Sequence, residues 1–116
     1  MEFNFNIEDK KGYSIINIEG NLMDSIQVKN INEAVEEKIV NGVNRFIICA
    51  DKMNYMSSTG LGVLISILTK SRRLGGDISI CCVPPKVQEL LVITKLNTLF
   101  NVQKDLESSI VEITRN

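Results

Sequence analysis

Residues 54–62 read NYMSSTGLG and join two apolar runs of different periodicity. Before them, Phe46 to Cys49 is a β-branched and aromatic run typical of a buried strand. After them, apolar residues recur at the spacing of one helix face, namely Leu61, Leu64, Ile65 and Leu68. The sequence therefore predicts a strand, a junction and a helix, with Ser57, Ser58 and Thr59 at the helix start.

The three consecutive hydroxyl residues have a structural and a functional interpretation. A helix start leaves about four backbone N–H groups without partners, and a serine there commonly caps one of them. The functional alternative is that one hydroxyl accepts a phosphoryl group, since a helix N-terminus stabilises added negative charge. Three hydroxyls in a row exceed what one cap needs.

The residues before this segment predict a β-hairpin and a helix. Apolar and polar residues alternate over 3–8, which indicates a half-buried edge strand, and a polar turn at 9–12 leads into a second strand ending near Gly20. We expect a loop over 20–25, followed by an amphipathic helix over 28–39.

The residues after it continue the alternation of strands and helices. The long helix should end near Arg73, and a strand over 77–83 and a helix with Pro85 at its first position should follow. A short strand over 100–102 and a final helix over 106–113 complete the chain. This order predicts a single α/β sandwich domain over 1–116, with a mixed, mainly parallel sheet of four to five strands and about four helices.

Composition excludes several classes of function. The 116 residues carry a net charge of −1, which argues against a nucleic acid or an anionic membrane held by bulk electrostatics. The start of the chain lacks the basic and apolar regions of a signal peptide, and no apolar stretch approaches the roughly 18 residues that span a bilayer. We therefore expect a cytoplasmic protein without membrane contact.

The cysteines suggest core packing in a reducing compartment. Cys49, Cys81 and Cys82 all fall in predicted strands. Adjacent residues of a strand point to opposite faces, so we expect that Cys81 and Cys82 cannot share a metal ion. The chain has no histidine, and we expect neither a metal nor a cofactor.

No known catalytic motif is complete. Gly60 and Gly62 begin a G-x-G, but Ile65 stands where a dinucleotide-binding loop has its third glycine. Met56 stands where a nucleophile elbow would have a glycine, and a Ser-His mechanism has no histidine. The sequence thus favours a binding protein over an enzyme.

The junction resembles the signature of the STAS domain family of bacterial anti-sigma factor antagonists, Asp-Ser-(Ser or Thr)-Gly-Leu-Gly. On this pattern Ser58 falls on the family's phosphorylated serine, and Ser57 falls where antagonists usually have aspartate. Residues 85–96 and Phe100 resemble the C-terminal half of STAS domains. In the loop before the first helix, Met23 takes the place of the family's aspartate, and Asp24 follows one position late.

The resemblance implies a phosphorylation switch. The unphosphorylated antagonist binds an anti-sigma factor that is a serine kinase, phosphorylation by that kinase ends the binding, and a serine phosphatase restores it. ATP and magnesium belong to the kinase. The antagonist carries no cofactor of its own and makes no direct contact with nucleic acid.

The expected partner surface combines the signature with one side of its helix. Val63 and Ile67 place apolar groups beside the core face, where they either bind a partner or pack against neighbouring elements. The full set is Asp24, Ser57, Ser58, Thr59, Gly60, Gly62, Val63 and Ser66. The alternative is a STAS scaffold or ligand-binding subunit used without phosphorylation, which Ser57 in place of aspartate favours. A small-ligand carrier is a weaker interpretation, because no other polar cluster is evident.

Overall fold

The computed structural model describes residues 3–115. Its elements in chain order are β1 (Asn4–Lys10), β2 (Tyr13–Leu22), α1 (Ser25–Val40), β3 (Arg45–Met56), α2 (Ser58–Arg73), β4 (Asp77–Cys81), α3 (Pro85–Ile93), the 3₁₀ helix η1 (Leu96–Thr98), β5 (Asn101–Gln103) and α4 (Leu106–Thr114).

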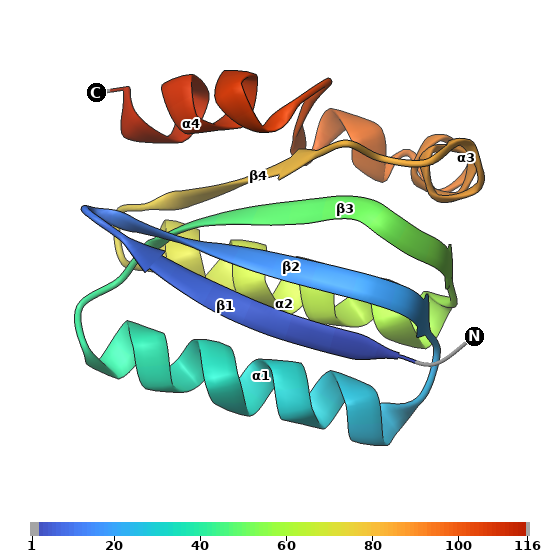
Figure 1. Ribbon diagram of the computed structural model, residues 1–116, viewed down its shortest axis with the longest axis horizontal. Helices are drawn as coiled ribbons and strands as arrows, with labels where there is room; N and C mark the ends of the chain where they lie inside the picture. Colours follow the sequence, from blue (N-terminus) through green and yellow to red (C-terminus); the bar gives the residue numbers. More distant parts are fainter. Residues whose placement is uncertain (1–2, 116) are drawn as a thin grey trace.

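The strands form one five-stranded sheet in the order β1-β2-β3-β4-β5. β1 and β2 pair antiparallel as a hairpin, with β1 at the edge, and all other neighbours are parallel. The predicted α/β fold, with its mixed, mainly parallel sheet, N-terminal hairpin and four α-helices, is confirmed (Figure 1).

Helices cover both faces of the sheet. α1 and α2 lie on one face, and α4 lies on the other (Figure 1). Side chains of a strand alternate between faces, so neighbouring residues contribute to different cores. Ile16 and Ile48 belong to the larger core with α1 and α2, whereas Ile15 and Ile47 pack in the smaller core with Ile113 of α4.

Several element boundaries differ from the sequence prediction. β2 and β3 extend to Leu22 and Met56, because the two strands continue to pair beyond the sheet's centre despite two shifts of register. Strand β4 ends at Cys81, so Cys82 lies outside it. Leu96, predicted to line α3, lies in η1.

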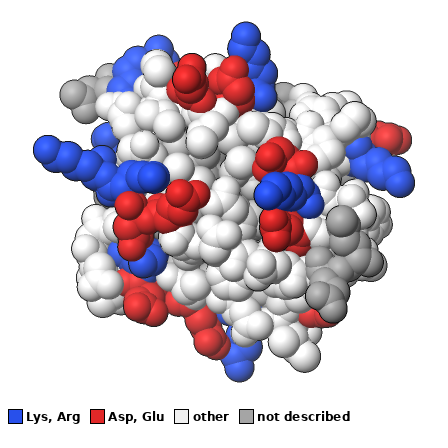
Figure 2. Space-filling view, viewed as in Figure 1, with Lys and Arg blue, Asp and Glu red and all other residues white. Residues whose placement is uncertain are grey.

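The surface carries charges of both signs. Acidic and basic side chains are interspersed on the face shown in Figure 2. Several form ion pairs between elements, such as Lys38 Nζ with Asp9 Oδ2 at 2.7 Å and Lys70 Nζ with Glu36 Oε2 at 2.8 Å. Among residues 3–115, the helices are too short or too polar to cross a membrane.

Candidate functional site

A single residue, Ser57, connects β3 to α2. Its backbone is extended, with φ −83° and ψ 173°, and its N–H donates to the Leu22 carbonyl oxygen at 3.0 Å. Its own carbonyl oxygen accepts from the N–H of Leu61 at 2.8 Å. The start of α2 is thereby fixed against the end of β2.

The Ser57 hydroxyl is fully engaged in structural hydrogen bonds. Its oxygen accepts from the Gly60 N–H at 3.1 Å, which caps the helix, and its O–H donates to the Met23 carbonyl oxygen at 2.8 Å. The capping role proposed for one of the three hydroxyls therefore belongs to Ser57. The same hydroxyl also ties α2 to the loop between β2 and α1.

Ser58 and Thr59, the first two residues of α2, have exposed side chains. Within residues 3–115, neither hydroxyl makes a hydrogen bond. Both therefore face solvent at the positive end of the helix dipole, where an added anion is favoured. Of the three hydroxyls, that of Ser57 caps the helix, and those of Ser58 and Thr59 are accessible to solvent.

Asp24 caps helix α1 beside this junction. Its Oδ1 accepts from the Gln27 N–H at 2.9 Å, and the Gln27 side-chain oxygen accepts from the N–H groups of Met23 and Asp24 at 2.7 and 3.2 Å. This reciprocal capping box fixes the two-residue loop that receives the Ser57 hydroxyl. The structure thus places the predicted site residues Asp24 and Ser57 on neighbouring helix starts.

Two predicted partner-binding residues are buried. Val63 has no exposed surface and packs in the core with Ile67, because α2 is covered by the sheet on one side and by α1 on another. Gly60 is also buried, and a Cβ there would press on the Leu22 carbonyl oxygen. The prediction that these two residues form part of the partner surface was wrong. Gly62 is exposed and Ser66 is half-buried.

Two exposed apolar residues near the site were missed in the sequence. Met23 is 46% exposed in the loop before α1, and Ile26 is 70% exposed in the first turn of α1. The sequence does indicate that Ile26 is exposed. The apolar residues that face the core of this helix are Val28, Ile31 and Val35, and Ile26 falls outside their period. Met23 is adjacent to the site, since its carbonyl accepts the Ser57 hydroxyl.

Comparison with known proteins shows the family to which this chain belongs. The profile of the STAS domain matches residues 4–109. This chain belongs to the STAS domain family. A sequence relative is BtrV of Bordetella bronchiseptica, named as a proposed anti-sigma factor antagonist, which is 22% identical over 88 residues, or 76% of each protein.

Solved STAS-type structures have the same fold. A proposed anti-sigma factor antagonist of Thermotoga maritima superimposes with a TM-score of 0.88 at 19% identity, covering 96% of this chain and 95% of that one. Bacillus SpoIIAA in its phosphorylated form superimposes with a TM-score of 0.77 at 17% identity, covering 97% of this chain and 100% of that one. The resemblance of residues 54–62 and 85–96 to STAS domains is thus confirmed at the level of family and fold.

The cap assignment within this STAS domain is directly testable. Ser57→Ala removes the acceptor for the Gly60 N–H and the donor to the Met23 carbonyl, and we expect it to lower the free energy of unfolding by about 1–2 kcal/mol. Ser58→Ala removes an exposed hydroxyl and should change the free energy of unfolding by less than about 0.5 kcal/mol. Chemical denaturation of the two variants compares them, and a more stable Ser57→Ala than Ser58→Ala would contradict the assignment.

Proposed function

We propose that this STAS domain is an anti-sigma factor antagonist whose partner binding is switched off by phosphorylation of Ser58. In the unphosphorylated state it binds an anti-sigma factor that is also a serine kinase, which frees a sigma factor for transcription. The observation that carries the proposal is that Ser57 is committed to hydrogen bonds, whereas the Ser58 hydroxyl is exposed at the helix start. Such an antagonist acts in the cytoplasm, where the kinase finds ATP.

The names of structural neighbours support this proposal. A Mycobacterium paratuberculosis protein named an anti-sigma factor antagonist superimposes with a TM-score of 0.82 at 16% identity, covering 98% of this chain and 96% of that one. SpoIIAA, whose phosphorylated form is described above, has also been solved unphosphorylated. Ser58 occupies the position that resembles the phosphorylated serine of the family.

The free protein should tolerate phosphate at Ser58 well. A phosphoserine carries about −1.5 to −2 charges at neutral pH. At the first residue of α2 this charge lies beside unpaired backbone N–H groups and the positive end of the helix dipole, which stabilises it. The modification therefore needs no change of fold in order to act.

Phosphorylation of Ser58 should act on partner binding. The proposed partner surface comprises Met23, Asp24, Ile26, Ser58, Thr59 and Gly62, all exposed and at or near the starts of α1 and α2. Apolar side chains such as Met23 and Ile26 gain by losing water in a complex. A phosphate in the same surface must also lose water, which costs several kcal/mol unless the partner supplies cations. Because each 1.4 kcal/mol is about a tenfold change in affinity, one phosphate is enough to end binding.

The cycle requires two external enzymes. The partner kinase supplies ATP and magnesium and transfers the phosphoryl group to the Ser58 oxygen, with release of the hydroxyl proton. A serine phosphatase returns the chain to its binding state by hydrolysis. In this cycle the STAS domain is a substrate and a binding module, not an enzyme.

A second candidate is a STAS scaffold or ligand-binding subunit that is never phosphorylated. Ser57 favours it, because antagonists usually have aspartate at this position and the Ser57 hydroxyl donates to the Met23 carbonyl at 2.8 Å. An ionised aspartate cannot donate that hydrogen bond. If a kinase needs the aspartate to engage the serine, this chain would not be a substrate.

Phosphoryl transfer in vitro tests the proposal. The purified chain should acquire one phosphate when incubated with its cognate kinase and Mg·ATP, and the Ser57→Ala variant should do the same. Ser58→Ala should remain unmodified while retaining its affinity for the kinase. If Ser58→Ala is phosphorylated like the wild type, the acceptor assignment fails, and if no variant is modified, the scaffold is favoured.

A further inference from the structure

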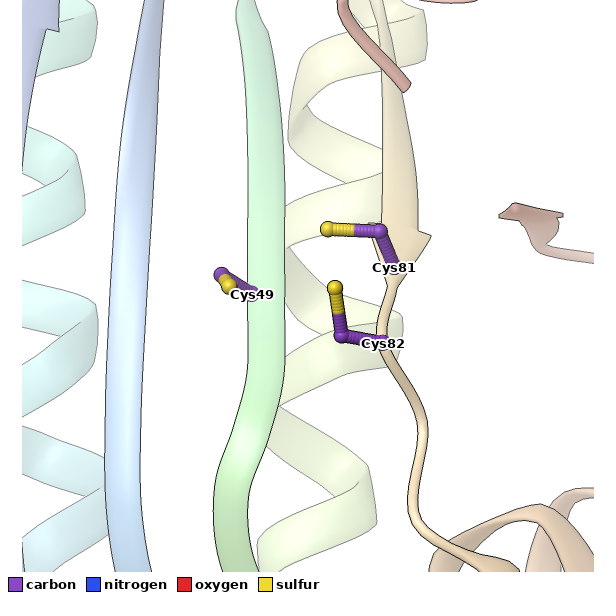
Figure 3. A group of neighbouring side chains, drawn as sticks. All are labelled: Cys49, Cys81 and Cys82. Atoms are coloured by element: carbon purple, nitrogen blue, oxygen red, sulfur yellow. The ribbon is translucent and has the colours of Figure 1, made fainter. Parts of the chain in front are cut away.

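Three cysteines from β3 and the end of β4 come together beneath the α4 side of the sheet (Figure 3). Cys49 is the register partner of Cys81 in the parallel pair, and Cys82 follows directly. Their sulfur atoms all lie within 4.8 Å of one another. All three are free thiols.

The position of Cys82 overturns the sequence prediction that Cys81 and Cys82 face opposite sides. That prediction required both residues to be in an extended strand, but β4 ends at Cys81. Cys82 has a φ of 60°, in the left-handed region that residues other than glycine seldom adopt. This turn of the backbone lets the sulfurs of Cys81 and Cys82 both point toward β3 (Figure 3).

The spacing of the sulfurs suits a shared metal ion. Thiolates bound to zinc at about 2.3 Å lie roughly 3.8–4.0 Å from one another in tetrahedral or trigonal geometry. Sulfurs within 4.8 Å can reach that spacing by small side-chain rotations. Asp51 Oδ1 lies 3.4 Å from the Cys49 sulfur, and its carboxylate would have to turn toward Cys81 and Cys82 to act as a fourth ligand.

We propose that Cys49, Cys81 and Cys82 bind one thiophilic divalent metal ion of the Zn²⁺ class, with Asp51 as the nearest candidate for the fourth ligand. Thiolate sulfur is a soft ligand that selects such ions over magnesium or calcium. Three thiolates and one carboxylate complete the four-coordinate shell that zinc prefers.

A hollow in the surface gives a cation access to Cys49. The hollow beside Cys49 and Asp51 measures about 430 Å³, which is ample for a hydrated ion. Glu8 and Glu19 also line this hollow, on the exposed part of the sheet's α4 side. Cys82 is itself half-buried rather than enclosed. The carboxylates of Glu8, Glu19 and Asp51 outnumber the one cation of the hollow, Lys52, so its net charge attracts a cation toward Cys49.

Metal binding is coupled to proton release. Each thiol gives up its proton when it becomes a thiolate ligand, so protons compete with the metal ion for the three sulfurs.

Titration of the reduced, metal-free chain with Cd²⁺ under anaerobic conditions tests the site. We expect a thiolate-to-cadmium charge-transfer band that saturates at one Cd²⁺ per chain, is displaced by excess Zn²⁺, and protects all three thiols from Ellman's reagent. The apparent affinity should fall as the pH is lowered, because protons compete with the metal ion for the thiolates.

The matched variant is Cys82→Ser, because Cys82 lies outside the strand, is only half-buried at the edge of the smaller core, and serine has nearly the same size. We expect it to weaken Cd²⁺ binding by about tenfold or more while keeping the metal-free melting temperature of the wild type. Zn²⁺ should raise the melting temperature of the wild type but not of the variant. Absence of the charge-transfer band, or equal affinity in wild type and Cys82→Ser, would overturn the proposal.

Discussion

Replacing Gly60 with alanine should lower the free energy of unfolding by about 2 kcal/mol, the size of a typical overpacking penalty. The new Cβ would press on the Leu22 carbonyl oxygen and lie 2.8 Å from the Leu22 Cγ. The carbonyl cannot move freely, because it accepts the Ser57 N–H at 3.0 Å. The contact between the end of β2 and the first turn of α2 would therefore have to open.

Gly62→Ala is the matched control for this prediction. Gly62 lies in the same helix two residues later, and a Cβ there meets nothing within 4 Å. Alanine is favoured over glycine inside a helix, so this variant should gain about 0.5–1 kcal/mol. Chemical denaturation of both variants measures the difference, and a Gly60→Ala protein as stable as Gly62→Ala would contradict the close packing of β2 against α2.

Ser58→Glu should weaken binding to the cognate kinase by about 100-fold or more. The carboxylate places a full negative charge at the start of α2, in the proposed surface beside Met23 and Ile26, and its desolvation in the complex is unfavourable. A phosphate carries more charge than glutamate, so the effect of phosphorylation should be larger. Isothermal titration calorimetry with the purified kinase gives the ratio of affinities.

Two controls separate this effect from a loss of folding. Glutamate in the first turn of a helix interacts favourably with the dipole, so Ser58→Glu should unfold at or above the temperature of the wild type. Thr69→Glu adds the same charge at an exposed position about 16 Å farther along α2 and should bind the kinase normally. Unchanged affinity of Ser58→Glu would argue against the switch.

The sequence predicted the elements whose pattern is local. The β-branched run before residues 54–62 and the helical period after them were enough to predict β3 and α2, and the alternation of strands and helices predicted the sheet. The start of α3 was predictable for the same reason, since Pro85 at its first position acts through its own backbone, whereas α1 begins at Ser25, three residues before the predicted start.

Features that depend on neighbouring elements were not predictable in this way. Val63 is buried because α1 packs beside α2, which no pattern within α2 reveals. The division of roles between Ser57 and Ser58 depends on the Met23 carbonyl, which another loop brings into reach. The position of Cys82 depends on one left-handed residue where β4 ends, a conformation that its sequence does not indicate.

The most direct test of the central claim is the phosphorylation state of the protein in its native cell. The chain would be purified under phosphatase inhibition, and the peptide spanning residues 54–70 would be analysed by mass spectrometry. The phosphorylation switch predicts a single phosphate on Ser58. A peptide that remains unmodified under all growth conditions would contradict the switch and favour a scaffold that works without phosphorylation.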